Sequence, residues 1–129
     1  MGRWVLIGLV AMAAAGAARA DMMNRHTHVG TPAGTPVQIG AHAGWNKRCQ
    51  PAPLPVISLE QPAGGTLSIT TGQKIAHGSI GSTTCDGRAF PAEIVTYTPK
   101  PGFHGEDTAH YQVRYGAEVQ DNTVTIMVQ

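Results

Sequence analysis

Residues 95–116 read VTYTPKPGFHGEDTAHYQVRYG, two alternating segments separated by a loop rich in proline and glycine. Alternation of apolar and polar residues is typical of a β-strand with one buried face, because successive side chains point to opposite sides of the sheet. The first segment ends at Tyr97, and in the second Ala109, Tyr111 and Val113 share one face. This part of the chain therefore predicts two β-strands joined by a turn.

The same pattern continues on both sides of this segment. Proline and glycine clusters separate short alternating runs, and no run has a sustained helical period. The predicted strands cover residues 37–39, 56–61, 66–70, 93–98, 109–113 and 124–128. Short strands about ten residues apart predict an all-β fold, an antiparallel β-sandwich.

In a sandwich, each strand buries alternate side chains against the facing sheet. The residues expected in the core are Leu67, Ile69, Val95, Tyr97, Ala109, Tyr111, Val113, Val124, Ile126 and Val128. Those expected to face solvent are His110, Gln112, Arg114, Thr123, Thr125 and Met127.

A spaced motif in the C-terminal half carries a family resemblance. The motif is Y-x-P-x-x-G-F-x-G-x-D-x-x-x-Y-x-V, formed by Tyr97, Pro99, Gly102, Phe103, Gly105, Asp107, Tyr111 and Val113. It resembles the repeating immunoglobulin-like and cadherin-like domains of bacterial secreted and surface proteins, although Ala109 stands where these domains usually have a large aromatic residue. The resemblance covers residues 55–128 and implies an immunoglobulin-like sandwich over residues 37–129.

The chemistry of the motif residues suggests that they shape the turn and close the end of the sandwich. Gly102 and Gly105 permit a positive φ, Phe103 can close the end of the sandwich, and Asp107 can accept hydrogen bonds from loop amides. In some relatives such an aspartate helps to bind calcium, which needs six to eight oxygen ligands. The other carboxylates available for that alternative are Glu106, Glu118 and Asp121.

The first twenty residues, MGRWVLIGLVAMAAAGAARA, have the features of a secretory signal peptide. Arg3 provides a positive start, residues 5–18 are mostly apolar, and residues 18–20 (Ala-Arg-Ala) fit a signal peptidase site. The apolar run is shorter than the ~20 residues of a membrane-spanning helix. We therefore expect cleavage before Asp21 and a periplasmic or secreted protein, with an uncleaved anchor as the alternative.

The composition after the leader excludes several partners. Residues 21–129 hold seven Lys and Arg against eight Asp and Glu, without a basic cluster, which argues against binding to nucleic acid or anionic lipid. No later apolar run is long enough to cross a membrane. Cys49 and Cys85 form an even pair, which in an oxidising compartment predicts one disulfide. Free or metal-binding thiols are the alternative, for which no CxxC motif is present.

Residues 21–36, DMMNRHTHVGTPAGTP, are polar and lack apolar periodicity, so they predict a flexible N-terminal segment. Thioether and imidazole ligands suit copper, and imidazole suits zinc. The candidate metal ligands are Met22, Met23, His26 and His28. The alternative is a polar tail with incidental histidines.

No catalytic constellation is visible in the sequence. No serine lies in a G-x-S-x-G setting, acids are few, and there is no phosphate-binding loop before a helix. Trp45 is expected to pack on the disulfide, or else to stay exposed as a stacking residue. We therefore predict an exported, non-enzymatic binding module without a cofactor, whose partner in the cell envelope is a protein or a glycan. Metal binding by the N-terminal segment is the alternative function.

Overall fold

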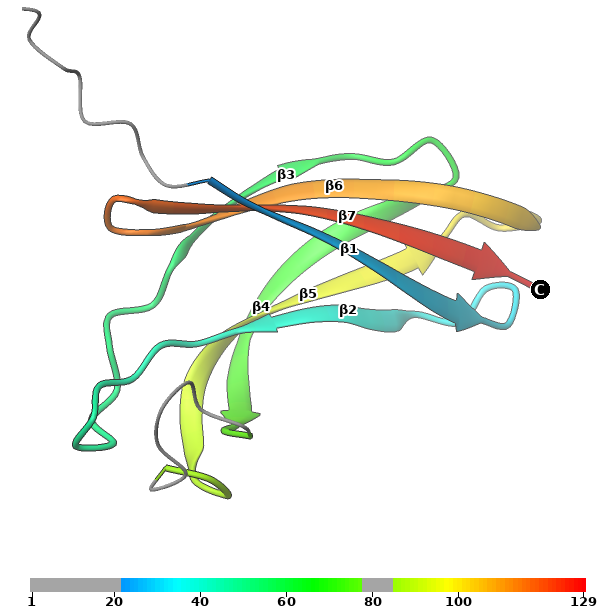
Figure 1. Ribbon diagram of the computed structural model, residues 1–129. Coiled ribbons are helices and arrows are strands. Elements are labelled where there is room, and N and C mark those ends of the chain that lie inside the picture. Colours follow the sequence, from blue (N-terminus) through cyan, green and yellow to red (C-terminus); the bar gives the residue numbers. More distant parts are fainter. Residues whose placement is uncertain (1–21, 78–84) are drawn as a thin grey trace, which may run out of the picture.

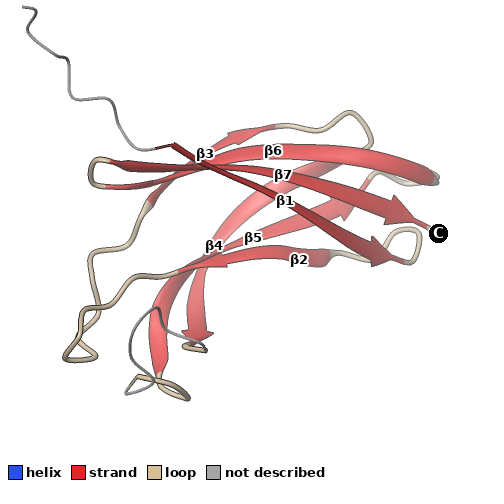
Figure 2. Ribbon diagram, in the orientation of Figure 1, coloured by secondary structure: helices blue, strands red, loops and turns tan. Residues whose placement is uncertain are grey.

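The computed structural model describes residues 22–77 and 85–129, which fold into seven strands in two facing sheets (Figure 1). The strands are β1 (Met22–Thr31), β2 (Val37–His42), β3 (Val56–Glu60), β4 (Gly65–Ile75), β5 (Ala89–Pro99), β6 (Gly105–Tyr115) and β7 (Glu118–Val128). One sheet has the order β1-β7-β6-β3 and the other β2-β5-β4. All regular elements in the described part are strands (Figure 2). The predicted all-β sandwich is confirmed, and the predicted leader lies outside the described residues.

The prediction of a flexible segment over residues 21–36 is wrong for residues 22–31. These residues form β1, which runs parallel to β7 from the Met22–Val119 pair to the Thr31–Val128 pair. β1 is an edge strand with mostly exposed side chains, so its backbone pairing leaves little apolar pattern in the sequence. Only its end turns inward, where Val29 packs against the core and Thr31 is buried.

The main core lies between the two sheets and matches the prediction at nine of ten positions. Ile39 joins the predicted residues, and Phe103 packs against them from the end of the sandwich. Ile69 is the exception, since its side chain is 38% exposed. It lies on β4, the edge of its sheet, where no neighbouring strand covers its outer flank.

The hairpin of β4 and β5 is longer than the sequence predicts. It is paired continuously from Gly65–Pro99 to Ile75–Ala89, which extends beyond the predicted strands at residues 66–70 and 93–98. Pro91 is tolerated in this central strand because β2 pairs with β5 only as far as Glu93. The missing N–H of Pro91 therefore faces no neighbouring strand.

A second, smaller core lies around the predicted disulfide, which is confirmed between Cys49 and Cys85. Trp45 packs there as expected, with its ring stacked on Phe90 at a centroid distance of 4.8 Å. The side-chain oxygen of Asn46 accepts hydrogen bonds from the backbone N–H groups of residues 48 and 50, which fixes the turn that presents Cys49. Cys49 itself has a φ of 59°.

Candidate binding face on the four-stranded sheet

The four strands β1, β7, β6 and β3 are in register, so their outward side chains form cross-strand rows. We call the surface made by these side chains the outer face. The rows, from one end of the sheet, are Met22–Val119–Arg114–Val56, Asn24–Asp121–Gln112–Ser58, His26–Thr123–His110–Glu60, His28–Thr125–Thr108 and Gly30–Met127–Glu106. The six residues that the sequence predicted to face solvent on β6 and β7 all belong to these rows.

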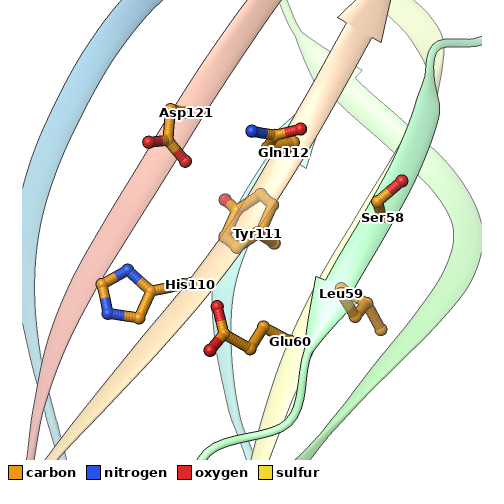
Figure 3. A pocket seen from close by; sticks show the side chains of 7 residues that line it. All are labelled: Ser58, Leu59, Glu60, His110, Tyr111, Gln112 and Asp121. Atoms are coloured by element: carbon orange, nitrogen blue, oxygen red, sulfur yellow. The ribbon is translucent and has the colours of Figure 1, made fainter.

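The middle of the outer face is hollowed into a shallow, open depression of about 440 Å³. It is bordered by Ser58, Leu59 and Glu60 from β3, by His110, Tyr111 and Gln112 from β6, and by Asp121 from β7 (Figure 3). The His110 Nδ1 lies 3.2 Å from the Thr123 hydroxyl oxygen, which orients the imidazole within its row. Carboxylates, an amide, a hydroxyl and an imidazole thus offer hydrogen-bonding groups to a partner from three strands.

One end of the outer face is apolar and exposed. Val56 is 67% exposed and Met22 is 59% exposed, and Arg114 is exposed in the same row. Val119, the fourth member of this row, is buried. Methionine and arginine are enriched in protein interfaces, whereas large apolar side chains usually avoid solvent. This end therefore has the composition of an interface.

The four N-terminal metal candidates all lie on β1, and metal binding by them remains a prediction. Met22, His26 and His28 point outward from β1, whereas Met23 has the opposite strand parity. Within residues 22–77 and 85–129, no group of three or more His, Cys, Asp or Glu side chains is placed to hold a metal ion. The calcium alternative fails on position, because Asp107 is buried while Glu106 and Glu118 lie at opposite ends of the β6–β7 pair.

The motif residues around Asp107 hold the fold together. The carboxylate of Asp107 accepts hydrogen bonds from the Tyr97 hydroxyl at 2.7 Å and from the Gly64 N–H at 3.0 Å. Burial is the main cause that raises the pKa of Tyr97, and the hydrogen bond to the Asp107 carboxylate raises it further. Gly102 and Gly105 have positive φ values of 79° and 112°, as expected. The predicted loop-capping role of Asp107 is therefore confirmed.

A second buried polar pair was not found from the sequence. The His42 Nε2 lies 2.8 Å from the Tyr111 hydroxyl, inside the sandwich. A Cβ at Gly40 would overlap both groups, so the glycine makes room for the pair. Burial raises the pKa of Tyr111 to about 12. Burial, helped by the positive charges of Lys74 and Arg25, lowers the pKa of His42 to about 4.

The His42 pKa predicts acid sensitivity. The unfolded chain takes up a proton near pH 6.5, but folded His42 resists protonation until about pH 4. The unfolded state therefore binds more protons in this window, and stability falls as the pH drops from about 6.5 to 4, by about 2 kcal/mol. Urea unfolding at several pH values should show a flatter dependence for His42→Gln. Equal slopes for the variant and the wild type would contradict this prediction.

The strand order and the motif together define an immunoglobulin-like sandwich. The sequence model of the family described as bacterial Ig domain matches residues 24–129, so this chain belongs to that family. Its structure is similar to the solution structure of amebosin, at 16% sequence identity and a TM-score of 0.45, over 84% of this chain and 98% of that one. No curated protein matches the sequence.

Bacterial Ig domains are in general non-catalytic, which agrees with an interaction module. The family and the Cys49–Cys85 disulfide are compatible with an extracellular or envelope location. Among the described residues, no helix is long and apolar enough to cross a membrane. Sequence reasoning identified the outward residues of β6 and β7 but missed those of β1 and β3, because pairing between distant strands leaves no local signal.

Proposed function

We propose that this chain is an exported interaction module that binds a protein partner in the cell envelope through its outer face. The observation that carries the proposal is the exposed row of Met22, Arg114 and Val56 beside the polar depression. An apolar and arginine-bearing end next to a hydrogen-bonding centre matches the composition of protein interfaces.

The chemistry of the outer face favours a protein over a glycan or a small molecule. Sugar rings commonly stack on aromatic side chains, and the rows hold no Trp, Tyr or Phe. Tyr111 lines the depression, but its side chain is buried, with the hydroxyl 2.8 Å from His42 Nε2, so it offers no stacking surface. Small-molecule sites are enclosed and mostly apolar, whereas this depression is open and lined largely by polar residues. Trp45, the other candidate for stacking, is packed on Phe90.

Export is supported by the leader-like residues 1–20 and by the disulfide. Mass spectrometry of the protein recovered from the envelope or the medium should find Asp21 at the N-terminus. Recovery of an intact N-terminus from the cytoplasm would contradict export.

The binding face is tested by a charge scan with a matched control. Ser58→Arg places a bulky charge in the depression, and Thr66→Arg places the same charge on an exposed position of β4 in the other sheet. We expect Ser58→Arg to weaken capture of the envelope partner more than tenfold, since an unpaired charge at an interface costs about 2 kcal/mol or more. Thr66→Arg should bind as the wild type does.

The same experiment separates the alternatives. Equal capture by both variants would exclude the outer face. If the wild type bound to a glycan array and Ser58→Arg abolished that binding, the ligand would be a sugar instead of a protein. Catalytic turnover of a substrate by the purified protein would contradict the proposal that the module is non-enzymatic.

A further inference from the structure

The two sheets have four edge strands, and three of them are protected against pairing with another strand. β1 carries Arg25 and two exposed histidines, β2 has a break in register between Gln38 and Gly40, and β3 is five residues long and lies between Pro55 and Pro62. Charges, bulges, short length and proline are the usual means of blocking an edge. β4 carries one charge, Lys74, near its C-terminal end, but residues 66–73 contain no charge, proline or break in register.

The direction of the β4 backbone follows from hydrogen bonds at both of its ends. Gly64 O accepts a hydrogen bond from Lys100 N, and Ala76 N donates one to Arg88 O. At each end of β4, therefore, the backbone N–H and C=O groups of the even-numbered residues point toward β5. The pairing between these points has no break in register. The N–H and C=O groups of the odd-numbered residues therefore point to the open edge.

The backbone N–H and C=O of Leu67, the first residue whose backbone groups point to the open edge, are already hydrogen-bonded. The side-chain amide of Gln61 donates to Leu67 O at 3.2 Å and accepts from Leu67 N at 2.8 Å. Gln61 thus makes the two bonds that a neighbouring strand would make, and it closes the edge at Leu67. The next outward residues along the strand are Ile69, Thr71 and Gln73, and no hydrogen bond to their backbone from beyond the edge is found in the described part of the chain.

We propose that the open edge of β4 pairs with β4 of a second copy of this chain, antiparallel about a two-fold axis at Thr71. In this register Thr71 faces Thr71, and Ile69 of each copy faces Gln73 of the other. Residues directly opposite exchange both backbone bonds, so all three outward residues of each copy are satisfied. The pairing joins the two three-stranded sheets into one of six strands.

The side chains suit this occupant. Residues 66–73 are uncharged, so the paired segments themselves bring no like charges together. A carboxylate lies beside the axis on β5, where Glu93 accepts a hydrogen bond from the Thr71 hydroxyl at 3.3 Å. Threonine opposite threonine is a favourable cross-strand pair, and Ile69, which is 38% exposed in the single chain, gains cover from the second copy. The segment is therefore complementary to itself, as an isologous interface requires.

Proline at position 71 tests the pairing through the backbone. Thr71→Pro deletes an N–H that points away from β5, so it leaves the β4–β5 ladder intact. Thr71→Val is the matched control, because it keeps the N–H and the strand propensity. Sedimentation of residues 21–129 from micromolar to millimolar concentration should show a dimer for the wild type and Thr71→Val, and at least tenfold weaker association for Thr71→Pro.

Three further variants keep the test independent of any folding defect. Ile69→Lys should weaken the dimer while Thr66→Lys leaves it unchanged. Gln61→Ala should tighten it several-fold, because it frees Leu67 to pair with Ile75 of the other copy. A wild type that stays monomeric at every concentration, or equal dimerisation by Thr71→Pro and Thr71→Val, would overturn the proposal. Ser58→Arg should dimerise normally, which separates this edge from the outer face.

Discussion

Replacing Asp107 by alanine is expected to lower the free energy of unfolding by about 3–5 kcal/mol. The Asp107 carboxylate is 7% exposed and holds the Tyr97 hydroxyl and the Gly64 N–H. The other carboxylate oxygen accepts a hydrogen bond from the Thr108 N–H at 2.9 Å, so removal of the carboxylate takes an acceptor from three donors in a region that water does not reach freely. For a domain of this size the melting temperature should fall by more than ~10 °C, measured by circular dichroism.

Two variants calibrate this expectation. Tyr97→Phe removes one of the three bonds that the carboxylate accepts and should cost about 1–1.5 kcal/mol. Asp121→Ala removes a carboxylate from the outer face and should change stability by less than ~0.5 kcal/mol. If Asp107→Ala unfolded within 1 kcal/mol of the wild type, the buried carboxylate would not organise this end of the sandwich.

Removing the disulfide is expected to destabilise the domain by about 3–4 kcal/mol, because the bond closes a long loop in the unfolded chain. The two cysteines are 36 positions apart, and both belong to the small core that includes Ala76 and Phe90. The measurement is urea unfolding of the Cys49→Ala/Cys85→Ala double variant against the oxidised wild type.

The fluorescence of Trp45 shows whether loss of the disulfide disturbs the small core, since Trp45 is the one tryptophan of residues 21–129. Its ring stacks on Phe90 beside the disulfide, so its fluorescence should shift to the red in the double variant even where the main core remains folded. Non-reducing mass spectrometry gives the control for the oxidised state. Unchanged stability together with an unchanged Trp45 spectrum would show that the small core is held by packing alone.

The two proposed contacts use different parts of the molecule. The outer face belongs to the β1-β7-β6-β3 sheet, and the β4 edge belongs to the other sheet. A dimer through β4 leaves both outer faces free, so a dimeric module presents two binding faces. A multivalent partner would then be held with an avidity above that of one face, because the second contact forms at a high effective concentration.

The sequence by itself determined the elements whose signal is local. Alternation located six of the strands and their inward sides, and the Tyr97-to-Val113 motif identified the immunoglobulin-like fold. The even cysteine pair predicted the disulfide. These predictions were correct because alternation reflects which face of each strand is buried. Turn residues such as Gly102 and Gly105 could also be predicted, because the turn needs a positive φ at these positions.

Only the tertiary structure decided which strands lie side by side. β1 is stabilised by backbone hydrogen bonds to β7, at the other end of the chain. Because its outward side chains are mostly polar and exposed, the sequence predicted a flexible segment there. The same long-range pairing builds the outer face and places His42 against Tyr111. It also leaves β4 at an edge, which exposes Ile69 despite its apolar character. Hydrogen bonds between backbones are almost indifferent to side-chain identity, so neither the pairing of distant strands nor the edges it leaves open can be read from residue patterns alone.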